Sequence, residues 1–133
     1  MGMYAAAQLI KELTRRDVRV ARARVLVMGL TFKENCPDLR NTRVVDLVQE
    51  LRDFHCSVDV YDPWVASDDC LREYGCPTVE TLTSSHYDGI VLAVGHQIFR
   101  EMGIEAVRAL GKPVHVLYDL KYLFPADATD LRL

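Results

Sequence analysis

The stretch VMGLTFKENCPDLRNTRVVDLVQEL, residues 27–51, decides how the chain folds. It begins with the apolar end of a strand, continues through a polar loop, and finishes in a helix whose apolar residues recur every three to four positions. A strand that leads through one loop into a helix is the first half of a parallel βαβ unit. Because ligands in open α/β sheets bind beyond the carboxyl ends of the strands, we expect a site at this loop.

Strand and helix patterns alternate along the rest of the chain. We expect helices over residues 2–17, 42–54, 65–74 and 96–111, the last as one or two short helices closed by Gly111. Strands are expected over residues 24–29, 56–63, 88–95 and 113–120, with a further short strand over 77–80, and the tail shows no clear period. The alternation predicts an α/β fold with a Rossmann-like, doubly wound, mostly parallel sheet, preceded by an N-terminal helix.

Composition narrows the class of protein. The chain has 133 residues, half of them hydrophobic, and a net charge of −3. This composition suits one globular domain and argues against a nucleic-acid or anionic-membrane surface. We expect a cytoplasmic protein, because no signal peptide opens the chain and no apolar run could span a membrane. The four cysteines form no C-x-x-C pair, so their thiols are expected to be reduced, and no metal site is predicted.

The loop after the first strand lacks the glycines of a dinucleotide cradle. A G-x-G-x-x-G loop lets the backbone approach a pyrophosphate, but here bulkier residues follow Gly29. Side chains must then supply the positive charge: Lys33 as a mobile point charge and Arg40 as a planar two-pronged donor that Asp38 could orient. Phe32 could cover an apolar or ring-shaped part of a ligand. The alternative is a solvated loop whose cations form surface ion pairs of little energetic value.

Acidic and basic residues also follow the later strands. Asp62 ends the second strand, where an acid can bind a ribose hydroxyl in dinucleotide folds. Without the glycines, we expect Asp62 to cap the strand and shape a turn with Pro63. His96 follows the strand over 88–95 at the binding edge, and both a ligand-side and a structural role are open for it. His55 and His115 are expected to be structural.

The loop and several later segments resemble a known family. TFKENCPDLRN and the helix after it are similar to the start of the C-terminal, UDP-binding domain of the UDP-glucose/GDP-mannose dehydrogenases. The likeness is greatest to the branch that oxidises UDP-N-acetylhexosamines for surface polysaccharides. VYDP, IVLAVGHQIF and YDLK match later segments of that domain, and MGMYAAAQLI resembles the end of the family's central helix. The resemblance therefore extends over nearly the whole chain.

The resemblance implies roles for individual side chains. Phe32 and Lys33 match residues that contact the UDP-sugar, and Lys121 matches a basic residue that contacts the nucleotide sugar. Arg40 matches the arginine that reaches across the domain cleft to NAD, with Asp38 as its structural partner.

The resemblance also implies which parts of the chemistry lie elsewhere. The family's enzymes oxidise a sugar C6 alcohol to a carboxylate in two NAD-dependent steps that use a cysteine nucleophile. Neither the N-terminal NAD lobe nor that nucleophile has a counterpart here, and Cys36 matches a non-nucleophilic position. No catalytic residue is therefore predicted. His96 matches a histidine often seen in this branch and is expected to support the site.

The implied organisation places the end of the central dimerisation helix at residues 1–20 and the UDP-sugar-binding domain at residues 21–133. We expect Tyr4, Leu9 and Leu13 to pack against a partner subunit, which predicts a homodimer or a frayed first helix. The main hypothesis is the nucleotide-sugar-binding lobe of a UDP-sugar 6-dehydrogenase, inactive without its NAD lobe. The alternative is a stand-alone UDP-binding or nucleotide-binding regulatory module, and a GDP-sugar ligand stays open.

Overall fold

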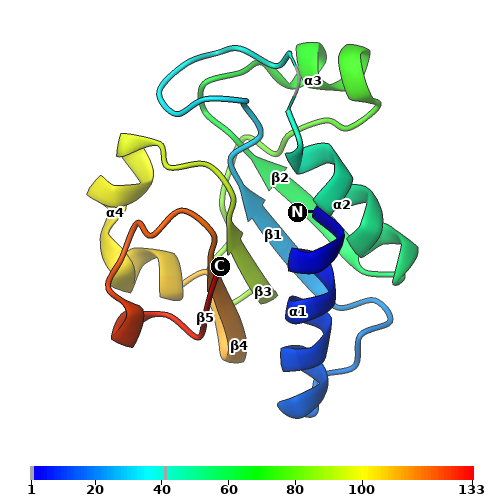
Figure 1. Cartoon of the computed structure of the whole chain (residues 1–133), viewed down its shortest axis with the longest axis vertical. Helices are drawn as coiled ribbons and strands as arrows, with labels where there is room; N and C mark the ends of the chain where they lie inside the picture. Colours follow the sequence, from blue (N-terminus) through cyan, green and yellow to red (C-terminus); the bar gives the residue numbers. More distant parts are fainter. Residues whose placement is uncertain (1, 41) are drawn as a thin grey trace.

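A parallel five-stranded sheet forms the centre of the molecule, in a computed structural model that describes residues 2–40 and 42–133 (Figure 1). Its strand order is β2-β1-β3-β4-β5, and each neighbouring pair is parallel. The doubly wound α/β prediction is therefore confirmed. The strands are β1 (Arg24–Met28), β2 (Ser57–Tyr61), β3 (Tyr87–Leu92), β4 (Gly111–Asp119) and β5 (Leu131–Arg132).

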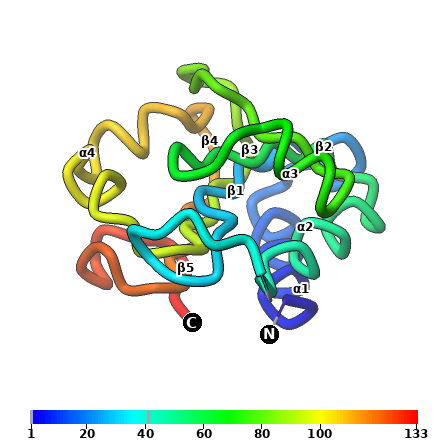
Figure 2. The backbone as a smooth tube through the Cα atoms, turned by 90° about the horizontal axis from the view of Figure 1, so that it is seen from above, coloured from blue at the N-terminus to red at the C-terminus, as the bar shows by residue number. Residues whose placement is uncertain are grey.

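Helices cover both faces of this sheet. They are α1 (Gly2–Arg15), α2 (Val44–Asp53), α3 (Ser67–Tyr74), α4 (Gln97–Arg108) and the short 3-10 turn η1 (Ala126–Ala128). Successive residues of a strand point to opposite faces, and β1 shows the consequence. Val25 and Val27 join the core beneath α1 and α2, whereas Leu26 and Met28 join the core beneath α4. Figure 2, a view from above, shows the two helical layers on either side of the sheet.

Some local predictions were wrong. Residues 77–80 form no strand, because their contact with β2 is a hydrogen bond from Val79 N–H to Val60 O (2.8 Å) without a ladder. Gly111 begins β4, where it pairs with Tyr87, instead of ending a helix. The tail contains η1 and the edge strand β5. The two-residue strand was missed because it is too short to show a period of two.

The first helix belongs to the core of this chain. Leu9 and Leu13 were expected to face a partner subunit, but both are fully buried and pack with Val25 and Val116 in the α1–α2 core. Tyr4, in contrast, is exposed. The division between residues 1–20 and 21–133 remains a prediction.

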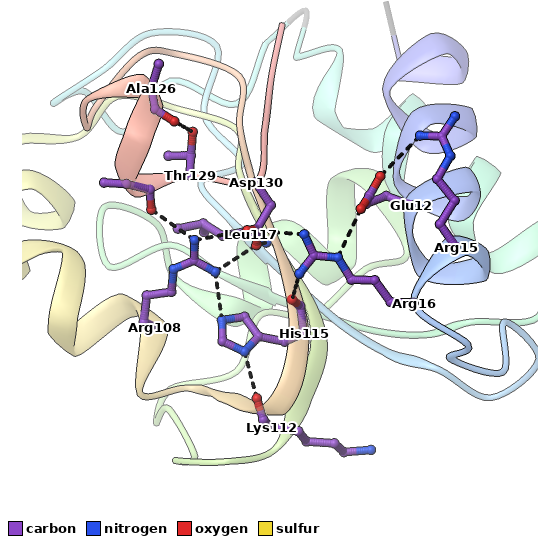
Figure 3. A network of polar contacts seen from close by, with 11 residues as sticks. Glu12, Arg15, Arg16, Arg108, Lys112, His115, Leu117, Ala126, Thr129 and Asp130 are labelled. Atoms are coloured by element: carbon purple, nitrogen blue, oxygen red, sulfur yellow. Dashed lines mark hydrogen bonds and ion pairs between the residues drawn. The ribbon is translucent and has the colours of Figure 1, made fainter.

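A carboxylate near the C-terminus ties the two helical layers together across the sheet edge (Figure 3). Asp130 accepts hydrogen bonds from Arg108 of α4 (2.7 and 3.2 Å) and from the backbone N–H of Leu117 (2.8 Å), and it forms an ion pair with Arg16, just after α1 (3.3 Å). Burial raises the pKa of Asp130, but the hydrogen bond from Arg108 and the other partners outweigh it and lower the pKa below its usual value. This cluster fixes the segment that follows β4.

The topology creates a switch point at the upper end of the sheet in Figure 1. From β1 the chain proceeds to β2 on one side, whereas β3 lies on the other side of β1. The loops after the neighbouring strands β1 and β3 therefore lead to opposite sides of the sheet. Doubly wound folds bind ligands where two neighbouring loops diverge in this way. Among the described helices, none has the length and apolar character needed to cross a bilayer.

Candidate functional site

A pocket of about 520 Å³ opens at this divergence between β1 and β3. In Figure 2 the loop after β1 crosses this end of the sheet between the two helical layers. The pocket has an apolar floor and a polar rim. It is lined by the start of α1, the loop after β1, the start of α2, the residues after β3 and those after β4: Gly2, Ala5, Thr31, Phe32, Lys33, Glu34, Thr42, Arg43, Val44, Leu47, Ala93, Val94, Gly95, Leu120 and Lys121.

The rim carries an excess of positive charge. Its charged residues are three cations, Lys33, Arg43 and Lys121, and one carboxylate, Glu34. All four residues are exposed. Phe32 is 52% exposed, so a large apolar ring faces solvent at the pocket. The pocket thus pairs a local cation cluster with an aromatic surface in a chain whose net charge is −3. This combination suits a ligand with an anionic part and a ring.

Asp62 fixes the beginning of the loop after β1. Its Oδ2 accepts hydrogen bonds from the backbone N–H groups of Leu30 (2.7 Å) and Thr31 (3.2 Å), and its Oδ1 accepts from Trp64 N–H (2.9 Å). Burial raises the pKa of this carboxyl, but the hydrogen bonds, led by that from His96, outweigh burial and lower the pKa below its usual value. The predicted turn-shaping role of Asp62 is confirmed. With its oxygens so occupied, the carboxylate is not free for a ribose hydroxyl.

His96 joins the same buried group. Its Nε2 lies 3.0 Å from Asp62 Oδ2 and 3.2 Å from Thr31 Oγ1, and its Nδ1 lies 2.8 Å from Asn35 N. Asp62, His96 and Thr31 do not form a nucleophilic triad, because the acid and the hydroxyl share one ring nitrogen instead of occupying opposite ones. The imidazole is 0% exposed, so it lies behind the loop and does not line the pocket.

Gly29 allows the strand ends to approach closely. Its φ is +102°, and a Cβ there would lie 2.5 Å from Val94 Cβ. The loop can therefore leave β1 directly against the residues that follow β3. Only a residue without a side chain fits this conformation and this gap.

Lys121 is positioned by a buried acid that sequence reasoning did not single out as a site residue. Asp119, which is 0% exposed, accepts hydrogen bonds from Lys121 N–H (3.2 Å) and Phe124 N–H (3.0 Å). The YDLK segment contained this signal, since an aspartate often accepts a hydrogen bond from the backbone two residues on. The same interpretation applies to Asp38, which accepts from Arg40 N–H at 2.9 Å.

Arg40 lies outside the pocket. Its guanidinium forms two hydrogen bonds with Asp38 (Nε–Oδ1 3.0 Å and Nη2–Oδ2 3.1 Å), and its side chain is 87% exposed. The hydrogen bond to Asp38 raises the pKa of Arg40 and lowers that of Asp38. The structure therefore brings Phe32, Lys33 and Lys121 together and places the Asp38–Arg40 pair elsewhere on the loop. Asn41, the last residue of the matched motif, lies outside the described residues.

Nothing in the pocket suggests covalent or metal chemistry. Its lining contains no cysteine, and Cys36, the cysteine of the loop, is not among the lining residues. Burial raises the pKa of Cys56 and of Cys70 to about 11, which makes both thiols poor nucleophiles. Among residues 2–40 and 42–133, no group of three acidic, histidine or cysteine side chains is arranged to hold a metal ion.

Comparison with known proteins identifies the family. A family model described as the UDP-glucose/GDP-mannose dehydrogenase family, UDP binding domain, matches residues 26–126. The chain belongs to the UDP-glucose/GDP-mannose dehydrogenase family. It is 57% identical over 133 residues to a UDP-N-acetyl-D-glucosamine 6-dehydrogenase of Pseudomonas aeruginosa and 53% identical to that of Salmonella typhi. The family and the N-acetylhexosamine branch predicted from the loop are therefore confirmed.

Each of these two relatives is about three times as long as the region matched here. The chain is covered completely, but it spans 32% of the Pseudomonas protein and 31% of the Salmonella protein. Solved structures have the same fold. An NDP-N-acetyl-D-galactosaminuronic acid dehydrogenase of Methanosarcina mazei matches 95% of this chain and 26% of its own, with a TM-score of 0.79 at 22% identity. A UDP-D-ManNAc dehydrogenase of Pyrococcus horikoshii matches 93% of this chain and 28% of its own, with a TM-score of 0.74 at 24% identity.

Proposed function

We propose that this chain is the nucleotide-sugar-binding domain of an NAD-dependent UDP-N-acetylhexosamine 6-dehydrogenase that serves surface-polysaccharide synthesis. The observation that carries the proposal is the pocket at the switch point, which collects Phe32, Lys33 and Lys121 from two separate loops. The complete enzyme would oxidise the C6 alcohol of the sugar to a carboxylate. This domain would bind and orient the substrate for chemistry performed elsewhere.

Charge supports a nucleotide diphosphate diester as the ligand. The diphosphate of a UDP-sugar carries two negative charges, and the rim offers three cations against one carboxylate. Lys33 and Lys121 lie on loops after different strands, so together they can contact an extended diphosphate from two sides. Phe32 supplies an apolar surface for a ring of the ligand.

NAD would bind mainly outside this chain. NAD accepts a hydride when bound, but the loop after β1 does not fit a dinucleotide, because its charge comes from side chains and Asp62 is already hydrogen-bonded. Arg40 is the residue proposed to reach the cofactor. Its exposed, pre-oriented guanidinium suits a contact to a separate NAD lobe.

We further propose a cytoplasmic homodimer formed through the helix of which α1 is the end. The exposed side chains of Met3 and Tyr4 support this proposal, since they leave an apolar surface beside the pocket end of α1. Leu9 and Leu13 take no part in the proposed interface, because they are buried within this chain.

Calorimetric titration of UDP, GDP and NAD into the chain tests the proposed function. We expect UDP to bind and NAD not to bind. Lys33→Ala removes one charge-assisted contact to phosphate, so it should weaken UDP binding roughly tenfold, the equivalent of about 1.4 kcal/mol. Lys11→Ala is the matched control, because Lys11 is an exposed lysine of α1 that does not line the pocket, and it should leave binding unchanged. Binding of NAD without UDP would overturn the proposal.

A further inference from the structure

The residues that face the ligand form a short arch with both ends attached to one buried side chain. Phe32, Lys33 and Glu34 line the pocket, and Thr31 and Asn35 flank them in the sequence. Both flanking residues contact the imidazole of His96, through Thr31 Oγ1 at 3.2 Å and Asn35 N at 2.8 Å. The position of Lys33 at the pocket therefore depends on a buried ring that does not line the pocket.

Asn35 strengthens the second attachment. Its φ of +55° turns the chain back toward α4, and its Oδ1 accepts a hydrogen bond from Gln97 N–H (2.8 Å), the first residue of that helix. Asparagine tolerates this left-handed conformation better than most residues. Asn35 thus caps α4 from another loop, while its own N–H points at His96.

The contacts specify one protonation state of His96. A backbone N–H can only donate, so Nδ1 must carry no proton and accept from Asn35. The proton of the neutral ring then lies on Nε2 and is donated to the carboxylate of Asp62. A second proton, on Nδ1, would place two donors face to face at 2.8 Å and break the Asn35 attachment.

The surroundings of His96 contain few other groups that could respond to pH. Two aromatic rings lie next to its imidazole. The ring centroids of His96 and Trp64 are 6.1 Å apart, and those of His96 and Phe99 are 5.3 Å apart. The titratable side chain in direct contact with it is Asp62, which is hydrogen-bonded to Nε2. Burial, with the charge of Asp62 as a second cause, raises the pKa of Cys70 of α3 to about 11. The arch itself adds Lys33 and Glu34, and the first turn of α4 adds Arg100, all at the surface.

We propose that His96 is a positioning residue whose neutral form holds the arch in place, and that its protonation releases the Asn35 end and weakens ligand binding as the pH falls. The proposal rests on the proposed function, since it concerns the affinity of the nucleotide-sugar pocket. It assigns to a fully buried histidine a role in setting that affinity without contact to the ligand.

Two amide variants distinguish the roles of the two ring nitrogens, Nδ1 and Nε2. In His96→Asn, the side-chain oxygen lies near the position of Nδ1 and can still accept from Asn35 N–H. In His96→Gln, the longer side chain reaches the position of Nε2 and loses the Asn35 contact. Neither amide titrates, and both variants keep all of the other titratable side chains.

The experiment is calorimetric titration of UDP-N-acetylglucosamine from pH 8 to pH 5.5, because both phosphates of this diester keep their charge over that range. Wild-type affinity should fall roughly tenfold toward pH 5.5, the effect of one lost buried hydrogen bond. His96→Asn should bind with a flat pH profile, and His96→Gln should bind weakly throughout. An identical pH dependence in the wild type and in His96→Asn, or a flat wild-type profile, would overturn the proposal.

Nuclear magnetic resonance of the free protein gives a readout that does not depend on ligand binding. The imidazole nitrogens of His96 should show the neutral Nε2–H form at pH 8, and the protection of the Asn35 amide proton, relative to the intrinsic exchange rate at each pH, should be lower at pH 5.5. Absence of ligand binding by the wild type at pH 8 would reject the proposed function and leave this readout standing. An Nδ1–H form at pH 8 would reject the role of His96 alone.

Discussion

Replacement of Asp62 by asparagine tests whether the loop after β1 is held by a buried negative charge. Asp62 is 3% exposed, and its two oxygens accept hydrogen bonds from Leu30 N–H, Thr31 N–H, Trp64 N–H and His96 Nε2–H. Asparagine keeps the size and shape of the side chain but replaces one acceptor oxygen with a donor. All of the surrounding groups are donors, so no rotation of the amide can satisfy every one of them.

The size of the effect follows from these contacts. The best orientation points the amide oxygen toward Leu30, Thr31 and His96 and leaves the amide N–H₂ against Trp64 N–H. The partly buried Trp64 N–H then loses its partner, at a cost near the lower end of about 1–3 kcal/mol, and the remaining hydrogen bonds are no longer charge-assisted. We expect Asp62→Asn to lower the free energy of unfolding by roughly 3 kcal/mol.

Urea unfolding at pH 7 measures this loss, with Asp68→Asn as the control. Asp68 is exposed and no hydrogen bond involves its side chain among the described contacts, so its replacement should change stability by less than about 0.5 kcal/mol. The pKa of Asp62 is lowered from an ordinary value of 3.8. Its contribution should therefore be complete above about pH 4 and fade as the pH falls toward the folded-state pKa. Equal stability of the wild type and Asp62→Asn at pH 7 would refute the account of the loop.

Three further substitutions test other parts of the account. Gly29→Ala should cost at least about 2 kcal/mol in urea unfolding, because its Cβ would meet Val94; Gly75→Ala, also at positive φ but in open space, should cost less. Glu34→Gln removes the carboxylate from the pocket rim and should tighten UDP binding roughly threefold in calorimetry. Asp130→Asn should lower stability by roughly 2 kcal/mol, a loss that shrinks below pH 4 because the pKa of Asp130 is lowered in the folded state.

Local sequence patterns predicted most of the fold because its main elements carry strong periodic or apolar signals. The runs that became β1 and β3 are buried on both faces and contain continuous apolar residues. α2 shows an apolar stripe, and Gly75 ends α3 in a left-handed conformation as expected from glycine's preference. The kink at Gly103 (φ +83°) explains why residues 96–111 suggested either one or two helices.

The missed features depend on partners far apart in the sequence. β5 has only two residues, and its place is fixed by Asp130, whose arginine partners lie on opposite helical layers. His96 and Asp62 are separated by 34 residues, so nothing local indicated that they form one buried group. The resemblance identified Lys33 and Lys121 as site residues, but only the fold shows that their two loops border one pocket.

The most direct measurement is a titration of the isotope-labelled chain with UDP followed by nuclear magnetic resonance. We predict that the amide signals of Phe32, Lys33, Gly95 and Lys121 shift together and saturate with a single dissociation constant. The signal of Lys112, which lies at the opposite end of the sheet near the start of β4, should stay in place. Shifts confined to other parts of the surface, with these pocket signals unchanged, would contradict a nucleotide site between β1 and β3.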